Sequence, residues 1–232
     1  MSRPLIALDF STLDHLSLLN GQYRYCLDLV CGLARLRPAA DFVLLGSWPD
    51  LVTEIRDVIR DQQGQWAYCQ LSHHRGRGRY WRDQLRYTQA LRRLHPSLYH
   101  SLDGFVPLTS PCPVVTTQYD LMVELFPEYN KVRAAAGYHL NRWATRRLVR
   151  RTICISETTA SDLRHIWRVA RERIDVVMLG TDYLSYVRED RVSARRPEIG
   201  LSAESWPIIL SPYNLEPQKP DLLASGRSES AD

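Results

Sequence analysis

Residues Tyr99 to Glu128 read YHSLDGFVPLTSPCPVVTTQYDLMVELFPE. Two short apolar runs, Ser97 to His100 and Pro113 to Thr117, end abruptly in polar residues. Short apolar runs bounded by Pro and Gly are typical of buried strands in a parallel sheet. Polar groups just past such strand ends lie where open α/β sheets bind their ligands. The stretch therefore predicts one side of a binding cleft.

The rest of the chain alternates strands and helices around this stretch. The strands are predicted over 4–10, 41–46, 65–71, 152–155 and 173–179, and the helices over 22–36, 49–61, 80–94 and 129–150. A further helix is expected to begin at Thr159-x-x-Asp162, which resembles a capping box. This order predicts an α/β fold, a Rossmann-like doubly wound parallel sheet flanked by helices.

Two of these helices have apolar residues at helical spacing, which predicts a buried face. They are Trp81, Leu85, Thr88 and Leu91 in the helix over 80–94, and Val132, Ala136, Leu140 and Trp143 in the helix over 129–150.

Composition narrows the class of protein. The 232 residues are 44% hydrophobic and 24% charged, with a net charge of +4, as in an ordinary globular protein and unlike a dedicated nucleic-acid binder. The five cysteines form no C-x-x-C pair, which favours a reduced, cytoplasmic protein. We expect contact with a membrane to be peripheral at most, at its inner face, because no apolar run is long enough to span a bilayer.

Polar residues at the predicted strand ends are candidates for binding a hydroxyl-rich ligand and supplying a base. They are His100, Asp103, Gln118, Tyr119, Asp120 and Glu124. The alternative is that they are ordinary loop residues that cap the sheet. Asn20-Gly21, before a helix, fits an anion site or a plain N-cap, and for Ser156-Glu157 capping is the simpler interpretation.

Two arginine clusters remain to be explained. They consist of Arg75, Arg77, Arg79, Arg82 and Arg86, and of Arg142, Arg146, Arg147, Arg150 and Arg151. Either cluster suits an anionic membrane surface or a phosphate-bearing substrate, and the alternative is a solvated face with nearby acids. No H-x-H or H-x-x-x-H pair is present, so a metal site is not expected.

Five segments, in order, resemble motifs of the retaining GT-B glycosyltransferases of family 4. They are NGQYRYCLDLVCGL, YHSLDGFVPL, VVTTQYDLMVELFPE, ICISETTASDLR and RIDVVMLGTD, within a likeness that covers roughly Pro4 to Asp182. LSPYNLEPQK then resembles the first strand of that family's donor domain.

This resemblance implies two Rossmann-like domains, of which the N-terminal one, expected over 1–182, holds the acceptor. It also implies transfer of a sugar from a nucleoside diphosphate with retention, without a bound metal or other cofactor. Asp120 and His100 match positions on the acceptor side and at the transferred sugar, so they are the candidate catalytic residues. The implied substrate-binding residues are Asn20, Gly21, Tyr23, Arg24, Asp103, Gln118, Tyr119, Glu124, Ser156 and Glu157, and Lys219 matches a diphosphate contact.

The chain departs from the family pattern in three places. Gln118-Tyr119-Asp120 replaces the commoner x-H-D, Asn214 stands where an arginine is usual, and the E-x₇-E carboxylates are absent. We therefore expect a linker over 183–206 and, over 207–232, the start of a truncated donor domain, with little or no activity from the chain alone.

The expected acceptor is a saccharide or lipid-linked saccharide in envelope polysaccharide synthesis. Two alternatives stay open. One is a non-catalytic half-enzyme or interaction module that docks a separate donor-domain chain. The other is an unrelated doubly wound binding protein.

Overall fold

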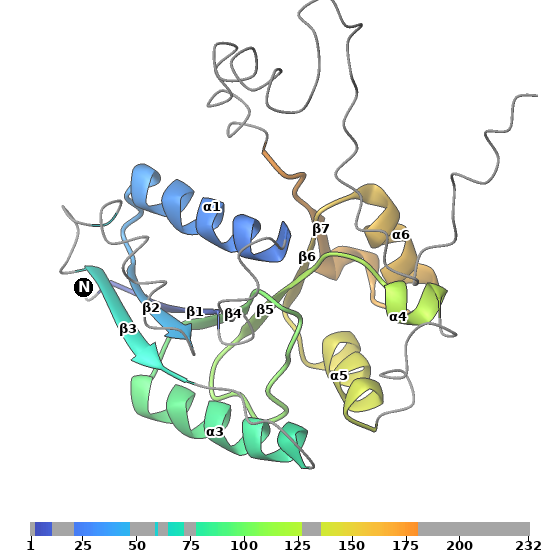
Figure 1. Ribbon diagram of the computed structural model, residues 1–232, viewed down its shortest axis with the longest axis horizontal. Helices are drawn as coiled ribbons and strands as arrows, with labels where there is room; N and C mark the ends of the chain where they lie inside the picture. The colour runs from blue at the N-terminus through green and yellow to red at the C-terminus, as the bar shows by residue number, and fades with distance from the viewer. Residues whose placement is uncertain are drawn as a thin grey trace, which may run out of the picture. The chain divides into compact units, whose positions relative to one another are not determined.

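The computed structural model describes residues 3–10, 21–46, 59, 65–71, 78–126 and 136–180. Within these residues the chain forms a seven-stranded parallel sheet flanked by helices (Figure 1). Several predictions lie outside the described residues. They include the helix over 49–61 except for Ile59, residues 129–135 of the helix over 129–150, Arg75 and Arg77 of the first arginine cluster, the linker over 183–206, and the donor-domain start over 207–232.

The sheet has the strand order β3-β2-β1-β4-β5-β6-β7. The strands are β1 Leu5–Asp9, β2 Asp41–Gly46, β3 Trp66–Gln70, β4 Leu98–Ser101, β5 Val114–Gln118, β6 Arg151–Cys154 and β7 Ile174–Val176. The helices are α1 Gly21–Leu36, α3 Arg79–Leu94, α4 Met122–Leu125, α5 Ala136–Arg147 and α6 Glu157–His165, with a 3₁₀ turn η5 at Arg171–Arg173. The predicted doubly wound parallel sheet is confirmed, because the chain moves outward from β1 to β3 and then returns to build the other half from β4.

Alternation along the strands divides the core between the two faces of the sheet. Leu8 and Leu44 pack with Val30 of α1 on one face. Ala7 and Leu45 pack on the other face, in a cluster that includes Tyr87 and Leu91 of α3 and Ala144 of α5. Both faces of β1 and β2 are therefore covered, which explains why the sequences of these two strands are almost continuously apolar.

The predicted apolar stripes of α3 and α5 do not pack inward as whole faces. Thr88 and Leu91 are buried, but Trp81, Leu85 and Trp143 are 57%, 65% and 51% exposed.

Polar side chains of α3 and α5 take inward positions instead. Gln84 Nε2 donates to the Val106 carbonyl (3.0 Å) while its Oε1 accepts from the Leu108 amide (2.7 Å). Asn141 of α5 binds the same loop, accepting from the Val106 amide at 2.9 Å. The inward sides of α3 and α5 therefore include side chains that hold this loop, and Trp81, Leu85 and Trp143 lie on the exposed sides.

Some elements differ from the predictions. The short helix α4 was not expected, α5 ends at Arg147 instead of 150, and β7 ends at Val176, so that Val177–Leu179 are exposed. The cap of α6 is Ser156 rather than Thr159: Ser156 Oγ accepts from the Thr159 amide at 3.1 Å. The simpler interpretation of Ser156-Glu157 as a helix start is thereby confirmed.

Candidate functional site at the strand ends

The carboxyl ends of all seven strands lie at one edge of the sheet because every pairing is parallel. The order of the strands reverses between β1 and β4, and open α/β sheets bind ligands beside such a reversal. His100 lies in β4, Asp120 lies two residues past β5, and Ser156 lies two residues past β6. These three strands are neighbours, so the sheet brings the predicted residues to a common edge.

His100 is buried under α1 rather than open to solvent. It is 8% exposed, and its Nε2 lies 3.0 Å from Thr117 Oγ1. Burial lowers the pKa of His100 from 6.5 to about 4. The imidazole is therefore neutral near pH 7 and positions the β5 end through Thr117.

The β5 end joins α1 to the sheet through two tyrosines. Tyr25 Oη lies 3.2 Å from Thr117 Oγ1, and its ring meets that of Tyr119 edge-on with a centroid distance of 5.4 Å. Tyr119 Oη donates to the Leu102 carbonyl at 2.7 Å. Burial raises the pKa of both tyrosines, so both remain neutral hydroxyls. Tyr25 and Thr117 are site residues that the sequence patterns did not single out.

Asp120 is exposed at this edge, with one oxygen engaged. Its Oδ1 accepts from the amide of Met122, the first residue of α4, at 3.1 Å. Because the Met122 amide holds one oxygen of Asp120 while the side chain is open to solvent, the carboxylate can accept a hydrogen bond from a ligand hydroxyl without reorganising.

Glu124 is placed differently from Asp120. Its side chain is 2% exposed and bonded to Arg142 Nη1 at 2.6 Å, and its Oε1 also accepts from Trp167 Nε1 at 3.2 Å. Arg142 Nη2 donates to the Ile166 carbonyl at 2.6 Å. Glu124 therefore ties α4, α5 and the segment after α6 together, and its contacts indicate a structural role.

Asp103 and Gln118 shape the loop after β4. Asp103 Oδ1 accepts from Ser101 Oγ and from the Phe105 amide, each at 3.0 Å. Gly104 has φ +82°, and a Cβ there would lie 2.9 Å from Gln118 Oε1. The loop thus passes directly over the amide of Gln118, which is itself 9% exposed.

The helix α1 and the start of α6 complete this edge. Gly21 and Arg24 are exposed, Tyr23 is buried, and Arg24 Nε donates to Asp28 Oδ2 at 3.1 Å. Glu157 is exposed in the first turn of α6, where the helix dipole favours an acid. Thr159 Oγ1 donates to the Tyr119 carbonyl at 2.9 Å, which fixes α6 against the β5 end. Asn20 and Lys219 lie outside the described residues.

Asp9 was not among the predicted site residues, although it ends the first strand. It is 1% exposed at the β1–β4 reversal, where its two oxygens accept from the hydroxyls of Tyr87 and Tyr99. Desolvation and the nearby Asp9 charge raise the pKa of both tyrosines well above the ordinary value. The carboxylate thereby fixes α3 and β4 to β1. Its position at a strand end was the signal in the sequence, and its tyrosine partners were not predictable from spacing.

The predicted residues therefore divide by accessibility. Gly21, Arg24, Asp120 and Glu157 face solvent, whereas Tyr23, His100, Gln118 and Glu124 are buried. Over the described ranges, no three His, Cys, Asp or Glu side chains are grouped to hold a metal ion. Over the same ranges, no helix has the length and apolar character needed to cross a membrane.

Comparisons with known proteins bear on this arrangement. The model of the family described as Glycosyltransferase Family 4 matches residues 19–183, more than half of the chain. A glycosyltransferase from Rickettsia africae ESF-5 matches 88% of this chain and 51% of its own, at 10% identity and a TM-score of 0.50, a likeness of fold alone. No curated protein matches.

Two further solved structures have slightly lower scores. Arabidopsis thaliana UGT89C1 complexed with UDP covers 84% of this chain and 56% of its own, at 11% identity and a TM-score of 0.49. A UDP-N-acetylglucosamine 2-epimerase from Rickettsia bellii covers 87% and 52%, at 10% identity and the same score. The chain thus spans about half the length of the solved structures that it matches.

The resemblance of the sequence motifs is confirmed by the family match, and the parallel sheet with its reversal between β1 and β4 is the architecture that the resemblance implied. The chain belongs to glycosyltransferase family 4, and its seven-stranded sheet is the Rossmann-like N-terminal domain of a GT-B glycosyltransferase.

Proposed function

We propose that this domain binds the acceptor for a retaining transfer of a sugar from a nucleoside diphosphate. The acceptor is a saccharide or lipid-linked saccharide, used in polysaccharide synthesis at the cytoplasmic face of the membrane. The donor is held by the partner domain of the GT-B fold, and no metal takes part, because basic side chains and helix dipoles stabilise the departing diphosphate.

The position of Asp120 carries the proposal. It is the exposed carboxylate directly beyond β5, and its Oδ1 is held by the Met122 amide while the side chain faces solvent. In the strand that leads to it, Thr117 lies within hydrogen-bond distance of the buried His100 and of the partly buried Tyr25, which fixes the β5 end. A carboxylate held at a strand end suits a sugar hydroxyl, because the carboxylate is already oriented before the acceptor binds.

Nucleotide release from UDP- and GDP-sugars tests the proposal, with the full chain incubated with simple saccharides and lipid-linked saccharides. We expect Asp120→Asn to lower acceptor-dependent release by about 10²-fold or more, as expected for a group that acts in the transition state. If the chain alone releases nothing, the same assay is repeated with a separately expressed donor domain of the family.

A matched control is Asp175→Asn in β7, an exposed aspartate paired with Arg151 at 3.3 Å. This variant should retain full release. Equal losses in the two variants, or release that does not depend on any acceptor, would remove Asp120 from the acceptor site. Binding of acceptor without release, with or without the donor domain, would favour the non-catalytic alternative.

A further inference from the structure

The helices α3 and α5 form a single layer whose outer surface is strongly basic. Residues 79–94 read RYWRDQLRYTQALRRL and residues 136–151 read AGYHLNRWATRRLVRR. Each stretch has five arginines, and the only acid in either, Asp83, is 2% exposed and faces inward. A solvated helix face normally mixes charges of both signs, so this surface does not fit the alternative of a solvated face with nearby acids.

Neighbouring acids neutralise only part of the charge. Arg142 pairs with Glu124 and Arg151 with Asp175. Arg146, Arg147 and Arg150 are exposed and form no ion pair within the described part of the chain. A concentrated patch of unpaired guanidinium groups attracts an anionic surface over a distance of about one Debye length, ~10 Å at moderate salt.

Large apolar side chains lie among these arginines. Trp81 and Leu85 of α3 are 57% and 65% exposed, and Trp143 of α5 is 51% exposed. The two helices touch at their N-terminal ends, because a Cβ on Gly137 would lie 2.9 Å from the ring of Tyr80, the neighbour of Trp81. Exposed tryptophan and leucine beside arginine are the combination that enters the headgroup region of a bilayer.

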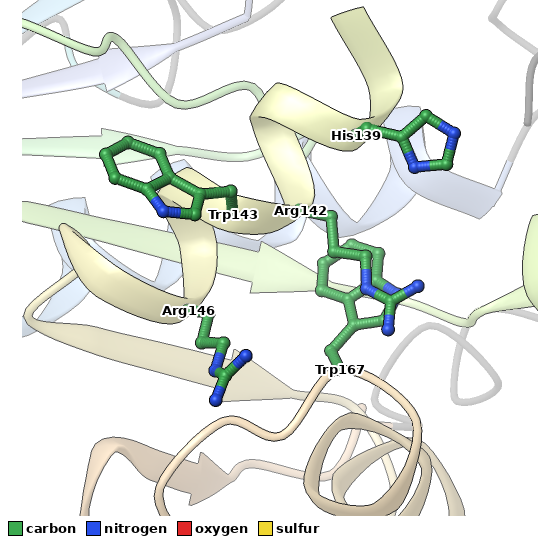
Figure 2. A pocket seen from close by; sticks show the side chains of 5 residues that line it. All are labelled: His139, Arg142, Trp143, Arg146 and Trp167. Carbon is green, nitrogen blue, oxygen red and sulfur yellow. The ribbon is translucent and has the colours of Figure 1, made fainter. Parts of the chain in front are cut away.

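A pocket of about 210 Å³ opens on α5 within this surface (Figure 2). His139, Arg142, Trp143 and Arg146 project from the helix, and the buried Trp167 lines the same pocket from the segment after α6. Trp167 is held in place because its Nε1 donates to Glu124. Two indole rings and basic side chains in one pocket suit a phosphate group attached to an apolar chain.

We propose that the outer face of α3 and α5 docks on an anionic membrane, with the α5 pocket receiving a lipid phosphate headgroup. The proposal deepens the proposed function and rests on it for the lipid-linked acceptor. In a parallel α/β sheet the helices run antiparallel to the strands, so the first turns of α3 and α5 lie toward the carboxyl edge. Docking through Trp81 and Trp143 would bring that edge close to an acceptor embedded in the bilayer.

Flotation of the full chain with vesicles tests the docking without any sugar substrate, so its result is independent of the proposed transfer. We expect binding to phosphatidylcholine vesicles containing phosphatidylglycerol, no binding to phosphatidylcholine alone, and release at high salt. Arg146→Gln with Arg147→Gln should lower partitioning by about 25-fold, since each arginine near an anionic surface contributes roughly fivefold. Trp143→Ser should lower partitioning at unchanged charge.

The control is Arg35→Gln with Arg37→Gln, two exposed arginines at the end of α1 on the other face of the sheet. This variant should bind like the unmodified chain. Equal losses in both arginine pairs would overturn the proposal, because the attraction would then be one of net charge alone.

Two further binding measurements distinguish a membrane from a soluble phosphate compound and from a nucleic acid. Millimolar glycerol 3-phosphate should leave vesicle binding intact, and full competition by it would replace membrane docking with a site for soluble phosphate compounds. A labelled single-stranded RNA should bind the unmodified chain no more tightly than it binds the variant with Arg146→Gln and Arg147→Gln. RNA binding that Arg146→Gln with Arg147→Gln removes, together with absent vesicle binding, would overturn the proposal in favour of a nucleic-acid surface.

Discussion

At the scale of single residues, burial determines what each polar group at the candidate site can do. The sequence placed His100 and Asp120 correctly at strand ends, because strand length and polar flanks are local properties. It did not distinguish the buried His100 from the exposed Asp120, since accessibility depends on α1 crossing over β4. Glu124 illustrates the same limit, because its partners Arg142 and Trp167 are distant in sequence.

His100 predicts a pH dependence of stability. Its pKa falls from 6.5 to about 4 on folding, so between those values only the unfolded chain takes up the proton. The free energy of unfolding should therefore decrease as pH falls from 6.5 toward 4 and be unaffected by this group above 6.5. At about 1.4 kcal/mol per pKa unit, the full effect is ~3 kcal/mol.

Denaturant unfolding at pH 7 and pH 4.5 measures this effect, with His100→Gln as the comparison. The decrease between the two pH values should be smaller in the variant by about 2 kcal/mol, whatever its stability at pH 7. Identical decreases in the two proteins would mean that His100 is not buried in its neutral form.

The pair of Glu124 and Arg142 predicts a second difference in stability. Arg142→Met leaves a carboxylate that is 2% exposed without its cation, which should lower the free energy of unfolding by about 3 kcal/mol. Adding Glu124→Gln should recover part of this loss, because the uncompensated charge is then gone. Urea titration of the unmodified chain, of Arg142→Met, of Glu124→Gln and of the double variant gives the coupling energy between the two sites.

The exposed pair of Arg3 and Asp41 provides the control. Its atoms are 3.9 Å apart and its side chains are 51% and 40% exposed, so Arg3→Gln should cost less than about 1 kcal/mol. A similar cost at Arg3 and Arg142 would contradict the structural role assigned to Glu124.

At the scale of elements, two helical glycines should respond oppositely to alanine. Gly32 in α1 has no atom within 4 Å of an added Cβ, so Gly32→Ala should stabilise the chain by about 0.5–1 kcal/mol through helix propensity. Gly137 in α5 has the Tyr80 ring at 2.9 Å, so Gly137→Ala should destabilise it by about 1–2 kcal/mol through overpacking against α3.

Thermal unfolding of the two variants, followed by circular dichroism, should give shifts of opposite sign. Stabilisation by both alanines would mean that α3 and α5 do not pack closely at Tyr80.

The sequence predicted both helices but not this contact, and it assigned the exposed Trp81 and Trp143 to apolar stripes. The predicted stripe does not match the buried face of α3, because the buried positions include Gln84, whose side-chain amide forms hydrogen bonds with the backbone of a loop.

At the scale of the whole domain, the doubly wound sheet was predictable because each strand is a short apolar run between turn residues. The strand order was not predictable from the runs themselves. It is determined by the right-handed crossovers and by long-range contacts such as Asp9 with Tyr99, which join segments 90 residues apart. The predicted doubly wound sheet specified no strand order, and the structure pairs β1 with both β2 and β4.

The sheet order makes a final prediction about local stability. Ala7 and Leu8 of β1 are 0% and 1% exposed and are covered on both faces, whereas β7 has three residues and is followed by the exposed Val177–Leu179. Amides of β1 and β4 should therefore exchange with solvent only through global unfolding, while those of β7 should exchange through local opening. Hydrogen exchange followed by mass spectrometry at several urea concentrations distinguishes the two routes. Exchange in β1 should accelerate with the urea dependence of global unfolding, and exchange in β7 should hardly change at low urea. If exchange in β1 also hardly changed at low urea, β1 would open locally, and the sheet would not unfold as a single cooperative unit.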